Sequence, residues 1–168
     1  AKAFDMRVVG VNRTVRAGEP NVDAMHGLDR LAEAVRDADF VVLGCALTDE
    51  TRGLVDARVL AAMPSHAVVI NVARGPVIDE AALHAALAGR RIGGAVIDTW
   101  WRYPTVPHQP VAEWPFRFDL LDNVIMSAHI AGWTTGTVLR RTRAMAANLD
   151  RLARGEPLDN VIAIGGRT

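Results

Sequence analysis

The sequence predicts an α/β domain with a parallel sheet and helices on both of its faces. Apolar runs rich in β-branched residues alternate along the chain with segments of helical spacing and composition. Half of the 168 residues are hydrophobic, which is enough to form a sizeable core. Strands that alternate with helices indicate parallel pairing, because a parallel crossover needs the length of a helix.

Each element is predicted from an apolar pattern and the turn residues that bound it. The five predicted strands are Arg7–Val11, Phe40–Gly44, Ala67–Val72, Gly94–Ile97 and Asn123–Ser127. The four predicted helices are Gly27–Arg36, Asp56–Met63, Glu80–Leu87 and Thr134–Ala153. The clearest unit begins with the β-branched run at 68–72, which Arg74-Gly75-Pro76 breaks. Asp79-Glu80 then opens a helix rich in alanine and leucine, and the following strand ends on Asp98.

The composition excludes several classes of function. Lysine and arginine (19) balance aspartate and glutamate (19), which argues against nucleic acid or a membrane surface as partner. No apolar run reaches the roughly 18–20 residues needed to span a bilayer. The single cysteine, Cys45, forms no internal disulfide and fits a reducing compartment. We therefore expect a cytoplasmic protein with a small-molecule partner and no metal site.

Three residues with useful chemistry directly follow predicted strands. Arg74, Asp98 and His129 should lie at one edge of the sheet, because open parallel sheets place their ligands beyond the carboxyl ends of their strands. A guanidinium can bind a carboxylate bidentately, and an imidazole can transfer a proton near neutral pH. Taken singly, such residues are more often surface ion pairs, structural histidines or turn caps.

The segment from Asn71 to Asp98 resembles the signature of the D-isomer-specific 2-hydroxyacid dehydrogenases. It carries their Asn-x-x-Arg-Gly run, a Gly-Ala-x-x-Asp strand and, further on, a His-x-x-Gly sequence that begins at His129. The resemblance covers nearly the whole chain. It implies a Rossmann-like domain of an enzyme that transfers a hydride between NAD(P) and a small 2-hydroxy or 2-keto acid, as a homodimer when complete. Arg74 would bind the substrate carboxylate, His129 would be the acid/base, and Asp98 would orient the nicotinamide.

The same resemblance implies a set of cofactor contacts. They are Asn12, Arg13, Thr14, Cys45, Val72, Ala73, Arg74, Asp98, His129 and Gly132. NAD enzymes usually place an acidic residue after the strand that precedes Asn12, whereas an arginine nearby accommodates the 2′-phosphate of NADP. The Asn12-Arg13 pair therefore favours NADP over NAD. The alternative is a plain polar turn.

The Gly-x-Gly-x-x-Gly turn that holds the pyrophosphate in Rossmann domains does not occur in this sequence. We therefore expect a fragment of a longer enzyme. It would lack the first strand and the Gly-rich loop at its N-terminus, and it would be inactive by itself. Residues 1–155 would form a partial dinucleotide-binding domain, and 156–168 a tail returning to a substrate domain. The strand outside the sequence would lie between Arg7–Val11 and Ala67–Val72. The alternative is a differently connected α/β domain.

Tyr103 departs from the family pattern. The carboxylate that pairs with the family's histidine precedes a proline, five residues after the strand-end aspartate; here that position is Tyr103. A phenol can hydrogen-bond an imidazole, but it carries no charge at neutral pH. Two other functions thus stay open: a formate-dehydrogenase-like enzyme, which also lacks this carboxylate and has a similar Trp-rich loop, and a dinucleotide-sensing, corepressor-like module. Simple aromatic packing of Trp100, Trp101 and Tyr103 is the structural alternative.

Overall fold

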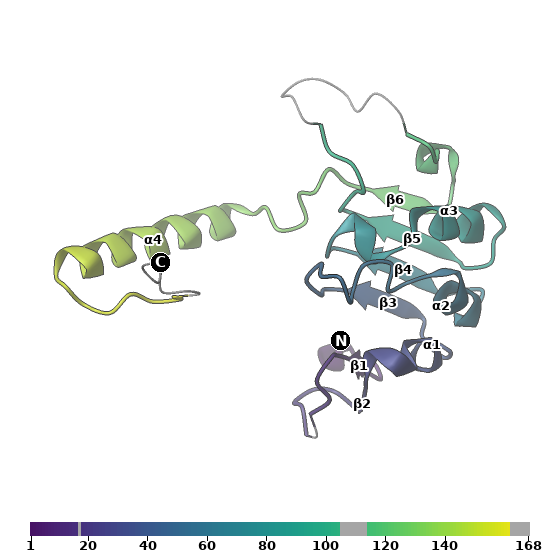
Figure 1. Cartoon of the computed structure of the whole chain (residues 1–168), viewed down its shortest axis with the longest axis horizontal. Coiled ribbons are helices and arrows are strands. Elements are labelled where there is room, and N and C mark those ends of the chain that lie inside the picture. Colours follow the sequence, from purple (N-terminus) through teal and green to yellow (C-terminus); the bar gives the residue numbers. More distant parts are fainter. Residues whose placement is uncertain (17, 105–113, 162–168) are drawn as a thin grey trace. The chain divides into compact units, whose positions relative to one another are not determined.

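The computed structural model describes residues 1–16, 18–104 and 114–161 (Figure 1). The chain divides into two compact units, Ala1–His129 and Ile130–Thr168. The first unit contains every described strand, and the second contains the long helix α4 (Thr135–Ala153). Among the described residues, no helix combines the length and apolar character required to cross a membrane.

A four-stranded parallel sheet forms the centre of the first unit. Its strands are β3 (Phe40–Leu43), β4 (Val68–Asn71), β5 (Gly94–Ile97) and β6 (Val124–Met126), in that spatial order (Figure 1). The register sets Val69 of β4 opposite Val41 on one side and Ala95 on the other. A second, two-stranded parallel sheet pairs β1 (Val9–Val11) with β2 (Ala24–His26). The predicted parallel α/β fold is confirmed.

Helices α1 (Leu31–Ala34), α2 (Ala57–Ala62) and α3 (Glu80–Ala88) connect the strands. Carboxylates cap two of them: Asp56 accepts a hydrogen bond from the Val59 N–H, and Asp79 accepts one from the Ala82 N–H. Such caps satisfy backbone donors that have no partner within the helix. Short 3-10 helices complete the unit: η1 (Lys2–Phe4), η2 (Leu28–Arg30), η3 (Gly75–Val77) and η4 (Phe118–Leu120).

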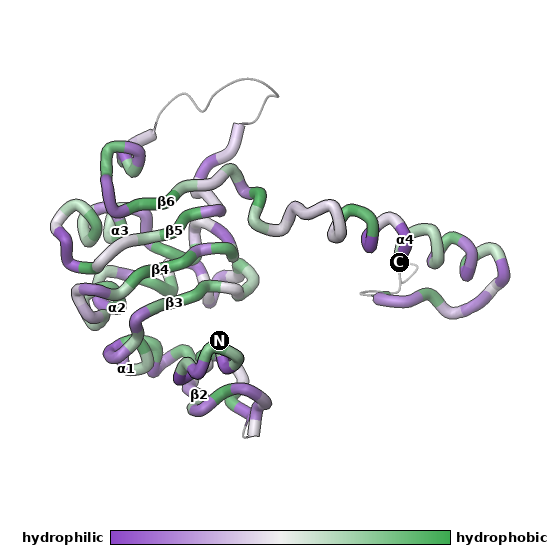
Figure 2. Tube along the Cα trace, turned by 180° about the vertical axis from the view of Figure 1, so that it is seen from behind, coloured by the Kyte–Doolittle hydropathy of each residue, from purple (hydrophilic) through white to green (hydrophobic). Residues whose placement is uncertain are grey.

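The core lies between these helices and one face of the sheet. Apolar residues dominate the strands (Figure 2), and alternate positions point to opposite faces. On the covered face, buried strand residues share one cluster with the helices: Val41, Leu43, Val69, Ala95 and Ile97 with Leu31, Val59, Leu60, Leu83 and Leu87. On the other face of β3, Phe40 and Val42 are 52% and 61% exposed. Within the first unit, the helices thus bury one face of β3.

The second unit contains α4, which is amphipathic. The Thr134 hydroxyl accepts a hydrogen bond from the Thr137 N–H and caps the helix. No residue of α4 is buried within the part of the chain that the structure describes. Its exposed apolar side chains are Val138, Leu139, Met145, Leu149 and Leu152.

Two local features differ from the sequence prediction. Strand β2 was not predicted, and the predicted helix Gly27–Arg36 is shorter and divides into η2 and α1. The cause of the first difference is tertiary, because Asp23 at the start of β2 bonds twice to Val8. The Asp23 N–H donates to the Val8 carbonyl, and the Val8 N–H donates to the Asp23 carboxylate. This bond and the Lys2 ammonium lower the pKa of Asp23.

The predicted position of the strand outside the sequence was wrong. Strand β4 pairs with β3 on one side and with β5 on the other, so β4 is not an edge. The sequence prediction did not include β2, so it took β4 for the fourth strand of the Rossmann order, a place that belongs to β3. In the classic Rossmann order 3-2-1-4-5-6, β1 and β2 correspond to the second and third strands, and β3 corresponds to the fourth. The first strand of that order would therefore lie between β1 and β3. A groove of about 1160 Å³ lies there, lined by residues of both strands.

Gly75 fixes how closely the chain after β4 approaches the chain after β5. A Cβ at this position would overlap the backbone of Trp100 and Trp101. We predict that Gly75→Ala lowers the free energy of unfolding by about 1–3 kcal/mol, the usual cost of overpacking. Chemical denaturation measures the change. Gly44→Ala is the matched control, because no described atom lies within 4 Å of its new Cβ; equal losses in both variants would contradict the prediction.

Candidate active site

The carboxyl ends of three neighbouring strands carry the predicted catalytic region. Arg74 follows β4, Asp98 follows β5 and His129 follows β6, and these strands pair in parallel. Backbone hydrogen bonds continue the pairing past the strands: the Asp98 N–H donates to the Asn71 carbonyl (3.1 Å), and the Ser127 N–H donates to the Ile97 carbonyl (3.0 Å). The structure therefore places the three residues at one edge of the sheet, as predicted.

The buried side chain of Asn71 shapes the turn that carries Arg74. Its amide donates to the Arg74 carbonyl, and its oxygen accepts from the Ala73 N–H, both at 3.1 Å. The turn leaves Val72 and Arg74 exposed and Ala73 buried. The guanidinium donates to the Ala73 carbonyl at 2.6 Å. An arginine is therefore presented at the sheet edge with most of its donors available to a ligand.

Asp98 is a buried carboxylate at the end of the neighbouring strand. The Ser127 hydroxyl donates to it at 2.5 Å. The carbonyl of Ser127 accepts a hydrogen bond from the indole N–H of Trp100 at 2.9 Å. Ser127 thereby links the ends of β5 and β6 to the loop that begins at Trp100.

Tyr103 and His129 form a direct pair. The Tyr103 hydroxyl lies 3.0 Å from Nδ1 of His129, and it accepts a hydrogen bond from the Trp100 backbone N–H, also at 3.0 Å. The His129 backbone has a positive φ of 58°, in the left-handed region. A phenol therefore occupies the position at which the family resemblance implies a carboxylate.

Aromatic residues build an open pocket beside this pair. It has a volume of about 700 Å³ and is lined by Trp100, Arg102, Tyr103, Pro104, Trp114, Phe116, Arg117, Phe118, Asp119, Met126 and Ala128. Trp101 stacks on Phe118 with ring centroids 5.5 Å apart, and its indole donates to the Ile78 carbonyl. Trp101 thus fits the packing alternative, whereas Tyr103 has a polar partner. At the rim, the hydrogen bond from Arg117 lowers the pKa of Asp119.

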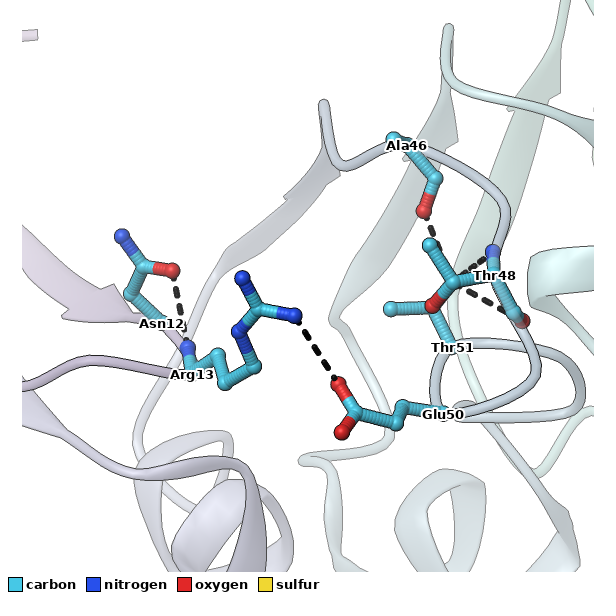
Figure 3. A network of polar contacts seen from close by, with 6 residues as sticks. All are labelled: Asn12, Arg13, Ala46, Thr48, Glu50 and Thr51. Atoms are coloured by element: carbon cyan, nitrogen blue, oxygen red, sulfur yellow. Dashed lines mark hydrogen bonds and ion pairs between the residues drawn. The ribbon is translucent and has the colours of Figure 1, made fainter. Parts of the chain in front are cut away.

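The residues predicted to bind the cofactor ribose follow β1 (Figure 3). The Asn12 side chain accepts a hydrogen bond from the Arg13 N–H at 2.8 Å. Arg13 points to Glu50, with 3.5 Å between Nη1 and Oε2, and the two side chains are 74% and 59% exposed. Thr14 is exposed. Exposed ion pairs of this kind contribute about 0–1 kcal/mol, so the guanidinium can exchange Glu50 for a phosphate.

The loop after β3 positions Glu50. The Thr51 hydroxyl donates to the Ala46 carbonyl at 2.7 Å and accepts from the Thr48 N–H at 2.8 Å (Figure 3). Cys45, half-buried with a free thiol, begins this loop. The sequence prediction missed Glu50, the Thr48–Thr51 turn and the role of Asn71. The Thr-x-x-Thr spacing is typical of a side-chain-stabilised turn, so it could have revealed the turn at Thr48–Thr51.

Two further predictions concern other parts of the chain. Gly132, which was predicted to contact the cofactor, belongs to the second unit, which begins at Ile130. Within the described ranges, no three histidine, cysteine, aspartate or glutamate side chains gather as a metal site would require.

We predict that Asn71→Leu destabilises the fold, because it leaves the Ala73 N–H without its partner, while the Arg74 carbonyl keeps only the bond from the Val77 N–H. Each buried group left unpaired costs about 1–3 kcal/mol, and the loss is measured by urea denaturation. Asn12→Leu is the control, since Asn12 is exposed and its side chain makes one local hydrogen bond; its effect should stay within about 0.5 kcal/mol. An unchanged midpoint for Asn71→Leu would remove Asn71 from this role.

Comparison with known proteins agrees with the geometry. The family described as D-isomer specific 2-hydroxyacid dehydrogenase, NAD binding domain, matches residues 1–131. A glyoxylate reductase of Pyrococcus horikoshii is 34% identical over 156 residues, which cover 93% of this chain and 44% of that protein. The chain spans about half the length of the curated relatives it matches.

Two solved structures are also similar. One is a D-isomer specific 2-hydroxyacid dehydrogenase from Xanthobacter autotrophicus Py2 in complex with NADPH and MES. It is 35% identical with a TM-score of 0.73, over 94% of this chain and 61% of that one. The other is an NADPH-dependent glyoxylate/hydroxypyruvate reductase from Sinorhizobium meliloti in complex with NADP and sulfate. Its identity is 26% and its TM-score 0.74, over 96% and 49% of the two chains. This chain belongs to the D-isomer specific 2-hydroxyacid dehydrogenase family, through its NAD binding domain.

Proposed function

We propose that the gene product containing this chain is an NADPH-dependent oxidoreductase for small 2-hydroxy and 2-keto acids. One observation carries the proposal: an exposed arginine and a histidine follow parallel strands of one sheet, at the same edge. The first can bind a carboxylate, and the second can exchange a proton with the adjacent oxygen. The reductases named above support this reaction over formate oxidation or a sensor without turnover.

Each residue has a distinct task in the proposed reaction. The Arg74 guanidinium binds the substrate carboxylate and polarises the neighbouring carbonyl. His129 gives a proton to the carbonyl oxygen during reduction and takes it back during oxidation. The cofactor, when bound, supplies or accepts the hydride. Tyr103 contacts His129 rather than the substrate, so it acts through the imidazole.

The residues present fit two ends of a dinucleotide. Arg13, exposed at the carboxyl end of β1, offers charge-assisted hydrogen bonds to a 2′-phosphate, and Asn12 adds no negative charge that would repel it. Asp98, at the end of β5, is a buried acceptor suited to the nicotinamide end. We propose that Thr14 and Cys45 line the adenosine side, and that Val72, Ala73 and Gly132 contribute near the nicotinamide.

Three wider proposals rest on the family and the composition. We propose a homodimer, because the family resemblance implies one, and a cytoplasmic location, because the sequence uses a single cysteine. We also propose that residues 1–155 act as the dinucleotide-binding part and 156–168 as a connecting tail; of this tail, 162–168 lie outside the described residues.

The cofactor preference gives a first test. We predict that Arg13→Ala weakens NADPH binding about tenfold or more, because a charge-assisted hydrogen bond is worth about 1.5–3 kcal/mol. Glu50→Gln should strengthen NADPH binding by up to about fivefold, because it removes the competing carboxylate. Fluorescence titration of the complete gene product measures both dissociation constants. NADH is the control ligand and should respond to neither change; a native preference for NADH of tenfold would refute the NADP assignment.

The reaction itself is tested by turnover. With NADPH, the complete gene product should reduce glyoxylate or hydroxypyruvate, and Arg74→Lys should lower kcat/KM at least tenfold, because an ammonium cannot bind a carboxylate bidentately. Arg91→Lys, on the exposed surface after α3, is the control and should leave kcat/KM unchanged. Oxidation of formate without reduction of keto acids would favour the formate-dehydrogenase-like alternative. Stoichiometric cofactor binding without any turnover would favour the sensor.

A further inference from the structure

The hydroxyl of Tyr103 has two polar neighbours with different hydrogen-bonding capacity. The Trp100 backbone N–H can only donate, and it lies 3.0 Å from the hydroxyl oxygen. Nδ1 of His129 can donate or accept according to the tautomer of the ring, and it also lies 3.0 Å away. The direction in which the hydroxyl donates its proton therefore decides which tautomer of the neutral imidazole fits this contact.

The hydroxyl is best satisfied by donating to His129. Its oxygen already accepts the Trp100 N–H, and a phenolic oxygen is a weak second acceptor because its lone pair is delocalised into the ring. The phenolic O–H is in contrast a good donor, and an unprotonated imidazole nitrogen is a strong acceptor. A hydroxyl that accepts from Trp100 and donates to Nδ1 uses every group in the chain of three.

We propose that Tyr103 is a positioning residue that holds neutral His129 as the tautomer with its proton on Nε2. A carboxylate at this position would do the opposite. Since a carboxylate only accepts, it would require the proton on Nδ1 and leave Nε2 bare in the neutral ring. The substitution of a phenol for a carboxylate thus reverses which nitrogen of the neutral imidazole can donate to a ligand.

This tautomer changes how the proposed reduction obtains its proton, a consequence that rests on the proposed function. As the cofactor's hydride reaches the keto carbon, the Nε2 proton passes to the carbonyl oxygen and the Tyr103 proton passes to Nδ1. The products are the hydroxy acid, a neutral imidazole protonated on Nδ1 and a phenolate, which the Trp100 N–H stabilises and solvent reprotonates. Proton transfer then proceeds without a preformed imidazolium.

The tautomer is measured directly, without cofactor or substrate. Two-bond and three-bond proton–nitrogen correlations of the complete gene product, labelled with ¹⁵N-histidine, identify the bare and the protonated nitrogen of each ring. The spectra are recorded at alkaline pH, in the range where the ring signals no longer change with pH, so that neutral rings are compared. His129→Gln assigns the signal. His66 supplies an internal comparison, because Nε2 of His66 lies 2.9 Å from the Asp39 carboxylate, which can only accept a hydrogen bond.

Native His129 should show a single tautomer with the His66 pattern. Tyr103→Phe should give a mixture of both tautomers, and Tyr103→Glu should move the proton to Nδ1. Tyr103 is partly exposed, so both variants should keep the fold, which far-ultraviolet circular dichroism checks in each sample. Protonation of native His129 on Nδ1, or an unchanged tautomer in Tyr103→Phe, would overturn the proposal.

The pH dependence of reduction tests the proton path separately, in the complete gene product. With Tyr103→Phe the neutral ring has no hydroxyl to resupply a proton to Nδ1, so kcat/KM for reduction should decline more steeply toward alkaline pH than it does in the native protein. Identical profiles would refute the proton path while leaving the tautomer result intact. Absence of activity in the native protein would refute the proposed function and leave the spectroscopic result unaffected.

Discussion

The candidate site depends on one buried residue, Asn71. Its backbone carbonyl accepts from Asp98, which ties the end of β4 to the end of β5. Its side chain bonds to Ala73 and Arg74, which turns the chain sharply after the strand. Strand register and the course of the arginine loop are therefore set by the same residue. The relative positions of the backbone at Arg74 and at Asp98 follow from this.

The loop after β5 extends this constraint to the third strand. Gly75 allows the Trp100 backbone to lie against the arginine turn, and the Trp100 indole reaches the Ser127 carbonyl after β6. The backbone N–H of Trp100 bonds in turn to Tyr103. A continuous series of contacts thus runs from the arginine loop to His129. The aromatic loop is both packing and support, because Trp101 fills the core side while Trp100 and Tyr103 fix polar atoms at the sheet edge.

Local sequence patterns were sufficient for five of the six described strands and for the residues that directly follow three of them. Arg74, Asp98 and His129 could be located because a β-branched run identifies a buried strand and parallel pairing fixes which ends meet. Strand β2 could not be found in this way, because its start depends on Asp23 bonding to Val8. Glu50 shows the same limit, since it becomes relevant only when the loop after β3 comes next to the end of β1. Long-range contacts of single polar side chains leave no periodic signal in the sequence.

The exchange of a carboxylate for Tyr103 alters the charge at His129 but retains a polar partner on Nδ1. The kind of partner on Nδ1 bears on the choice between formate oxidation and reduction of a 2-keto acid. The formate-dehydrogenase-like alternative rests on the missing carboxylate beside the histidine, yet the phenolic hydroxyl 3.0 Å from Nδ1 can itself donate a proton. A site for formate oxidation has no use for such a donor, because no proton is delivered to oxygen. A hydroxyl held between a backbone N–H and an imidazole therefore supports the proposed reduction of a 2-keto acid, a reaction that ends in a protonated oxygen.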